Sequence, residues 1–112
     1  MEKRIFSKQV KISDQFYESF EQFYDFGFES FGFLQAERYK QKVRASLDML
    51  SVFYAAYPEC RHLATKSQIY RNIILDSHLI IYRITAERIE VLDMIHSASS
   101  IRKIRNIRNI QL

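Results

Sequence analysis

The chain has 112 residues, 47% of them hydrophobic and 14% aromatic, so it can fill one modest core but not two. Its net charge of +4 is unevenly spread: residues 1–60 carry eight basic and nine acidic side chains, and residues 61–112 carry nine and four. The basic C-terminal half favours an anionic partner, either a nucleic acid or an acidic protein, with ordinary solubility charge as the alternative.

The sequence also argues against export and membrane insertion. A single cysteine, Cys60, excludes an internal disulfide, and no apolar run approaches the roughly 20 residues that cross a bilayer. The first residues lack the apolar block of a signal peptide. We therefore expect a cytoplasmic protein with no membrane partner.

A short strand is expected at residues 4–12. Ile5, Val10 and Ile12 alternate loosely with lysine and glutamine, as in a strand with one covered face. Because lysines line this segment, the strand should lie near an edge of the sheet.

Two helices should follow. The first begins at Asp14 as N-cap, carries aromatic residues at spacings of three and four, and should stop at Gly27. The second follows Gly32 and ends at Pro58, whose ring removes a backbone donor. The second helix has the most regular apolar stripe of the chain, namely Ala36, Tyr39, Val43, Leu47, Leu50, Tyr54 and Tyr57.

The aromatic residues between Phe16 and Phe33 could also form a platform on which nucleic-acid bases stack. Their charged neighbours are acidic, however: Glu18, Glu21, Asp25 and Glu29. The helical spacing therefore favours packing of these rings against a sheet.

Three strands are predicted between residues 69 and 96, where β-branched and aliphatic runs are separated by residues 75–78 and 85–87. Arg71, Arg83 and His96 lie inside these apolar runs. A cation in the middle of such a strand means that one face of the sheet is covered and the other works in water or against a partner.

The candidate metal ligands are scattered. Cys60, His62, His78 and His96 show no paired-ligand spacing, and the two glycines bracket a helix junction instead of forming a phosphate-binding loop. We expect no metal and no cofactor.

Residues 101–112 are expected to form a basic tail after a single domain that spans residues 1–100. Isoleucine recurs at every third position from Ile101 to Ile110. Since an α-helix turns by about 100° per residue, such a stripe drifts around the helix. A short helix with a frayed basic end is therefore expected, with about one turn docked and disorder as the alternative.

The order strand, two helices and three strands resembles the RelE/ParE toxin superfamily of bacterial toxin-antitoxin modules. The stretches that carry the resemblance are Tyr70-Arg71, residues 79–84 (LIIYRI) and residues 89–96 (IEVLDMIH). The resemblance implies an α+β fold in which two N-terminal helices pack on a small, mostly antiparallel sheet. It also implies the order β-α-α-β-β-β with a short C-terminal helix.

The resemblance also implies roles for single residues. Arg71 matches a basic residue on the second strand, Tyr82 and Arg83 match the Tyr-Arg pair of ParE-type chains, and His96 matches a histidine that ends the last strand. RelE-type members cut messenger RNA on the ribosome and have an arginine where this chain has Leu79. Loss of one preorganised donor typically costs on the order of 100- to 1,000-fold in rate, so this difference weakens the nuclease interpretation.

Two roles are open for these side chains. In an endoribonuclease, His96 would act as acid or base, and Arg71 and Arg83 would clamp the phosphate. Alternatively, the arginines hold acidic residues of an antitoxin or carboxylates of the sheet itself, such as Asp93.

The implied function is that of the toxin in a type II toxin-antitoxin module, a growth inhibitor of the plasmid-stabilisation type that a cognate antitoxin neutralises by covering the sheet face and the tail. Residues 82–84 and the leucine at position 79 favour DNA gyrase as the target. Ribosome-dependent cleavage of messenger RNA, or an inactive member that only binds antitoxin, are the alternatives. The tail cations Arg102, Lys103, Arg105 and Arg108 are expected to contact a partner.

Overall fold

A computed structural model of the chain describes residues 7–112. Its elements are β1 (Gln9–Ile12), α1 (Asp14–Phe31), α2 (Phe33–Phe53), β2 (Tyr70–Leu75), β3 (His78–Ile84), β4 (Arg88–His96), α3 (Ile101–Asn106) and the 3₁₀ turn η1 (Ile107–Asn109). The predicted α+β class and the predicted order of elements are therefore confirmed. The part of the first predicted strand at residues 4–6 lies outside the described residues.

The four strands form one sheet in the order β1-β4-β3-β2. The strands β2, β3 and β4 are antiparallel neighbours, and β1 pairs in parallel with β4 at the edge that the lysine-lined sequence predicted. Between β3 and β4 the register shifts: Ile81 pairs with Asp93 and Tyr82 pairs with Val91. Leu92 is the extra residue of this bulge.

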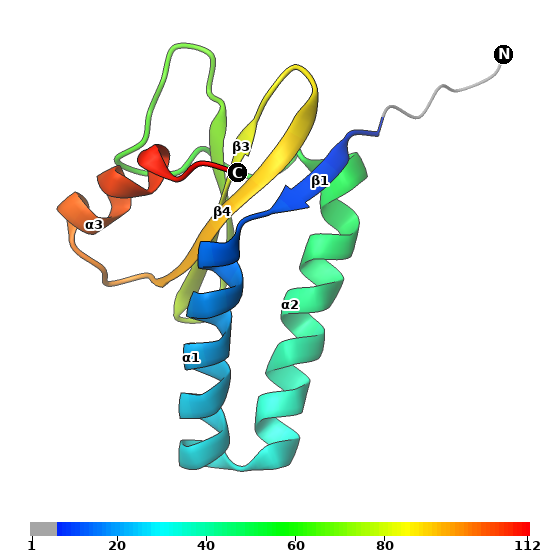
Figure 1. Cartoon of the computed structure of the whole chain (residues 1–112), viewed down its shortest axis with the longest axis vertical. Coiled ribbons are helices and arrows are strands. Elements are labelled where there is room, and N and C mark those ends of the chain that lie inside the picture. The colour runs from blue at the N-terminus through cyan, green and yellow to red at the C-terminus, as the bar shows by residue number, and fades with distance from the viewer. Residues whose placement is uncertain (1–6) are drawn as a thin grey trace, which may run out of the picture.

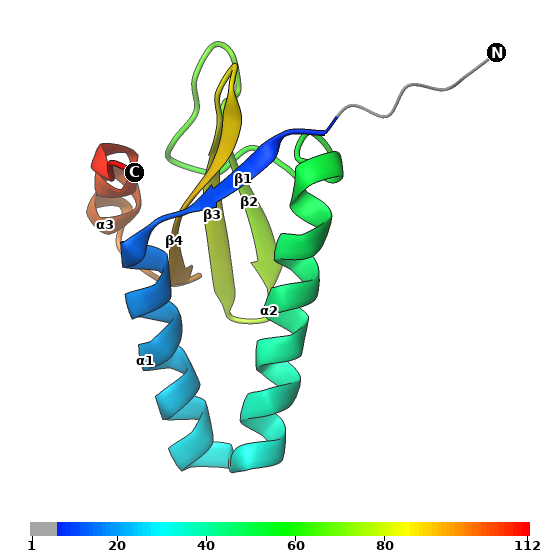
Figure 2. The ribbon, with the colours of Figure 1, turned by 45° about the vertical axis from the view of Figure 1, so that its right-hand side comes forward.

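Each face of the sheet carries its own apolar core. On one face, α1 and α2 bury Phe16, Val43 and Leu50 against Ile80 and Tyr82 of β3. On the other face, the C-terminal segment and the loop between α2 and β2 cover a second core that consists of Cys60, Leu63, Ile81, Leu92, Ile95, Ile104 and Ile107. In Figures 1 and 2 the lower halves of α1 and α2 extend past the end of the sheet.

The ends of α1 differ from the prediction by a few residues. Ser13, not Asp14, caps the helix, because its Oγ accepts from the Phe16 N–H at 3.0 Å and donates to the carbonyl of Leu92 at 2.6 Å. The helix passes through Gly27 and ends at Gly32, whose φ of 90° is easily adopted only by glycine. Gly32 therefore makes the sharp junction with α2.

The stripe predicted for α2 is confirmed as far as Leu50, and its last two members, Tyr54 and Tyr57, lie beyond the end of the helix. Ala36, Val43 and Leu50 are buried and the other members of the stripe are half-buried. The helix ends at Phe53, and a turn connects it to Pro58, so the helix stops several residues before the proline. No helix within residues 7–112 is long and apolar enough to cross a membrane.

The C-terminal segment is more firmly docked than predicted. Ile104 and Ile107 are buried, and Ile110 and Leu112 pack at the border of the same core. The chain changes from α-helix to a 3₁₀ turn at Ile107. Because a 3₁₀ turn has three residues per turn, this change keeps Ile107 and Ile110 on one face with Ile104, whereas Ile101 at the start of α3 is exposed.

Candidate functional site

Arg71 fastens the loop after α2 to strand β2. Its Nη1 donates to the carbonyl oxygens of Tyr57 at 2.8 Å and Ala55 at 3.1 Å, and its Nε donates to the carbonyl of Gln68 at 3.0 Å. Next to it, the hydroxyl of Tyr82 donates to the carbonyl of Tyr54. The guanidinium of Arg71 is thus engaged by backbone oxygens.

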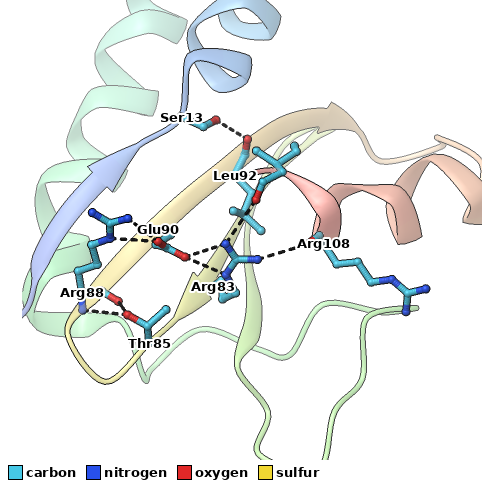
Figure 3. A network of polar contacts seen from close by, with 8 residues as sticks. Ser13, Arg83, Thr85, Arg88, Glu90, Leu92 and Arg108 are labelled. Carbon is cyan, nitrogen blue, oxygen red and sulfur yellow. Dashed lines mark hydrogen bonds and ion pairs between the residues drawn. The ribbon is translucent and has the colours of Figure 1, made fainter. Parts of the chain in front are cut away.

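Arg83 holds the C-terminal segment on the other face of the sheet (Figure 3). Its Nε and Nη2 contact Oε1 of Glu90 at 2.8 and 2.7 Å, while Nη1 donates to the carbonyl of Arg108 at 3.2 Å and Nη2 to that of Ile110 at 3.4 Å. Arg88 contacts the second oxygen of Glu90 at 2.8 Å. Burial alone would raise the pKa of Glu90, but the hydrogen bonds from the two arginines outweigh it and lower that pKa.

His96 lies at the opposite end of the sheet beside His78. The two residues are register partners, and their ring centroids are 5.6 Å apart. His96 Nδ1 accepts from the backbone N–H of Ala98 at 3.0 Å. His78 Nδ1 lies 2.7 Å from the hydroxyl of Tyr39, and its ring is 4.3 Å from that of Phe23.

The chemistry of this pair follows from its surroundings. Burial raises the pKa of Tyr39 to about 12, so the phenol is protonated at neutral pH and can donate to His78. Burial and the neighbouring His96 lower the pKa of His78, which Asp76 opposes. His78 is therefore neutral at physiological pH, and in the tautomer that leaves Nδ1 without a proton it accepts a hydrogen bond from the Tyr39 phenol.

Arg71, Arg83 and His96 do not converge on one point. Arg71 faces the α1 and α2 side of the sheet with Tyr82, whereas Arg83 faces the C-terminal segment. His96 is opposite His78, five residues along β3 from Arg83, which is roughly 17 Å in a strand. In this arrangement the three side chains cannot surround a single phosphate.

The carboxylate that holds an arginine is Glu90 and not Asp93. Asp93 Oδ1 instead accepts from Ser19 Oγ at 2.6 Å and from the Met94 N–H at 2.8 Å. Burial raises the pKa of Asp93 in spite of these two bonds. Asp93 thus ties α1 to the bulge of β4.

A groove opens where α1 and α2 extend past the sheet. It has a volume of about 870 Å³ and ends at His78 and His96. Its walls are mainly apolar, and Arg38 and Lys42 of α2 lie at its rim. The other lining residues are Gln22, Phe23, Tyr24, Phe26, Gly27, Phe31, Gln35, Ala36, Tyr39, Asp76 and Ser77.

The aromatic residues at the end of this helix pair are exposed, which the sequence prediction missed. Phe26 and Phe31 are 66% and 70% exposed, and Phe28 and Phe33 are also exposed. The spacing itself indicates this exposure, because two side chains that are two residues apart, such as Phe26 and Phe28, cannot both lie on one face of a helix. Of the aromatic residues of α1, only Phe16, Phe20 and Phe23 pack in the core between the helices and the sheet.

The four tail cations are exposed on α3 and η1. No ion pair within residues 7–112 involves Arg102, Lys103, Arg105 or Arg108. The same part of the chain contains no group of three or more potential metal-ligating side chains.

The chain is similar to known proteins in both sequence and fold. The family described as ParE toxin of type II toxin-antitoxin system, parDE, matches residues 10–101. No curated protein matches the chain. A solved structure described as a chromosomal ParDE TA system from P. aeruginosa contains a chain of the same fold, with a TM-score of 0.67 and 14% sequence identity. The alignment covers 81% of this chain and 97% of that one.

Proposed function

The chain belongs to the ParE toxin family of type II toxin-antitoxin systems, and on that premise we propose that it arrests bacterial growth in the cytoplasm by binding its target. The match over residues 10–101 is the observation that carries this proposal. A small antitoxin neutralises the protein, and the pair contributes to the maintenance of the plasmid or chromosomal region that encodes it.

The proposed target is DNA gyrase, and the proposed action is binding and not cleavage of RNA. Leu79 replaces a cation that RelE-type nucleases have, and residues 82–84 keep the ParE-type pattern. The separation of Arg71, Arg83 and His96 supports the same choice, because a catalyst needs its groups within hydrogen-bond reach of one substrate.

Both faces of the sheet are covered by elements of the chain itself, so the sheet face is not free for the antitoxin as the sequence led us to expect. The proposed docking site of the antitoxin is instead the groove between α1 and α2. Contiguous exposed apolar surface of this kind marks interaction sites, and a groove between two helices suits the apolar face of an amphipathic helix. Phe26 and Phe31 supply apolar contacts, while Arg38 and Lys42 favour acidic side chains at the border of that helix.

The target is tested by inducing the protein alone in a bacterial host. We expect growth arrest, induction of a DNA-damage reporter and intact translated messenger RNA. Co-expression of the small open reading frame adjacent to the gene should restore growth. Site-specific cuts in translated messages that vanish with His96→Ala would contradict the gyrase proposal and support ribosome-dependent cleavage.

Docking of the antitoxin in the groove is tested separately by replacing two of its exposed side chains. Phe26→Ser with Phe31→Ser should weaken antitoxin binding by at least about tenfold, because truncation of interface anchors of this size costs more than 1 kcal/mol each. Tyr17→Ser, at a site on α1 that is also exposed but outside the groove, is the control. Unchanged antitoxin affinity in the double variant would place the antitoxin elsewhere.

A further inference from the structure

A second surface of the molecule is strongly basic. The loop between α2 and β2 contributes Arg61 and Lys66, and the C-terminal segment contributes four cations. All six side chains are exposed. We call this set the basic surface; its members are Arg61, Lys66, Arg102, Lys103, Arg105 and Arg108.

The shared core under the basic surface holds its two segments together. Cys60 and Leu63 of the loop are buried in the same apolar cluster as Ile104 and Ile107 of the C-terminal segment. Arg83 adds hydrogen bonds to the carbonyl oxygen of Arg108 (Figure 3) and to that of Ile110. The cations are therefore carried on a docked backbone, which reduces the entropy lost when they bind a ligand.

Neighbouring acids leave the basic surface largely uncompensated. The only acidic residue in segments 59–68 and 97–112 is Glu59, whose carboxylate accepts from the backbone N–H of Thr65 at 3.3 Å. The ion pairs within residues 7–112 use Lys42, Arg83 and Arg88 and none of the six cations. Lys103 also acts on the carboxylate of Asp93 in β4. Six exposed cations with so few acidic neighbours form a binding surface for a polyanion.

The distribution of apolar side chains identifies the kind of polyanion. Of the exposed large apolar residues within residues 7–112, nine lie on α1 and α2, and only Ile101 lies on a segment that carries the basic surface. A protein partner needs an apolar centre in its interface, and a single-stranded nucleic acid needs aromatic side chains for stacking. The phosphate backbone of a duplex needs neither.

We propose that the basic surface binds the phosphate backbone of duplex DNA without reading its sequence. DNA binding goes beyond the proposed function and rests on it in one respect only. A toxin bound to DNA gyrase would lie close to the DNA that the enzyme holds. The groove for the antitoxin and the surface for DNA are then built from different elements of the chain.

The experiment measures binding of the purified full chain to a fluorescently labelled duplex of about 20 base pairs by anisotropy, over a series of salt concentrations. If all six cations contact phosphates, log K should fall against log salt with a slope of about −5, which is roughly a thousandfold between about 50 and 200 mM salt. Replacing Arg102, Arg105 and Arg108 by glutamine should reduce the slope to about −3.

Two further variants make the test specific. Arg61→Gln with Lys66→Gln should also flatten the slope, by about 2, because the loop and the tail form one surface. Lys11, Lys40 and Arg44 are exposed cations outside the basic surface, and their triple replacement by glutamine removes the same charge as the tail variant. This control should bind DNA with the slope of the unmodified protein.

Three results would overturn the proposal. The first is no detectable binding at about 50 mM salt. The second is an equal loss in the control variant, which would show an effect of net charge alone. The third is competition by polyglutamate that is as effective per charge as competition by DNA, which would assign the surface to an acidic protein. The binding assay contains neither gyrase nor antitoxin. Its outcome is therefore independent of whether the protein arrests growth.

Discussion

An arginine in the middle of an apolar strand can find its hydrogen-bond partners within its own chain. Arg71 and Arg83 both do so. Arg71 donates to backbone carbonyls of the loop after α2, and Arg83 joins Glu90 to carbonyls of the C-terminal segment. The sequence indicated that these positions are special, because a cation interrupts each strand. It did not reveal that their partners are backbone oxygens, since those are contributed by distant loops.

The role of Arg83 can be measured directly. Arg83→Met removes charge-assisted hydrogen bonds and should lower the free energy of unfolding by about 1.5–3 kcal/mol. It should also speed hydrogen exchange of the amides after Ile104, because the C-terminal segment loses its anchor. Arg88→Gln is the control, since Arg88 contacts Glu90 but not that segment. Equal hydrogen-exchange rates of these amides in both variants would contradict the role of Arg83 as the anchor of the C-terminal segment.

His78 gives the fold a dependence on pH. Its pKa in the folded state is lowered below the ordinary value of 6.5, so between these two values the unfolded chain binds more protons than the folded one. The contribution of His78 to stability is therefore complete above about pH 6.5 and declines as the pH falls through the lowered pKa. Protonation of His78 over the same range places a proton on both ring nitrogens, so the Tyr39 hydroxyl can no longer donate to Nδ1 and would accept from it instead.

Thermal unfolding at a series of pH values tests the contribution of His78 to the pH dependence of stability. The melting temperature should fall between about pH 7.5 and 5.5, and His78→Gln should flatten that dependence. Using the difference between the two proteins removes the contributions of Glu90 and Asp93, which are common to both. If the variant shows the same or a steeper fall, the pH dependence arises elsewhere.

At the scale of elements, the stripe of α2 is the main attachment of the helix pair to the sheet. Leu50 is fully buried in the core, and Leu50→Ala should lower the free energy of unfolding by about 2–5 kcal/mol. Leu47→Ala should cost less, because Leu47 is only half-buried. Met49→Ala, on the exposed side of the same helix, is the control for helix propensity. If urea unfolding shows the same loss of unfolding free energy for Met49→Ala and Leu50→Ala, the wrong face of the helix is assigned to the core.

Periodicity predicted those elements whose burial is regular along the sequence. It identified α2, the three C-terminal strands and the position of β1 at an edge. It failed where the local geometry changes: Gly27 continues a helix that Gly32 ends, and the 3₁₀ turn at Ile107 keeps the isoleucines from Ile104 onward on one face. Neither difference is visible in spacing alone, because tertiary packing decides which glycine and which helical period is used.

The candidate site was less predictable than the fold. The sequence singled out His96, but not its position beside His78 and Tyr39 at the end of the groove. That arrangement depends on the register between β3 and β4 and on how far α1 and α2 extend past the sheet. The tail cations were predicted as partner contacts, and their exposure agrees with that role without testing it.

At the scale of the whole molecule, two surfaces of different chemistry lie on separate elements. The groove between α1 and α2 is apolar with exposed phenylalanines, and the basic surface lies on the loop and tail that cover the other face of the sheet. A toxin that binds its target needs surface area and charge, whereas a nuclease depends on one group at the reacting atoms. The two kinds of toxin therefore respond differently to the loss of single residues.

Growth after induction is the most direct test of whether this chain is a toxin that acts by binding. The comparison includes the unmodified protein, His96→Ala, and the tail variant in which Arg102, Arg105 and Arg108 are replaced by glutamine. These replacements leave the buried isoleucines in place, so the fold should be retained, which circular dichroism can verify. We predict arrest by the unmodified protein and by His96→Ala, and weakened arrest by the tail variant. Normal growth with folded unmodified protein, or arrest that is lost in His96→Ala and kept in the tail variant, would contradict this account.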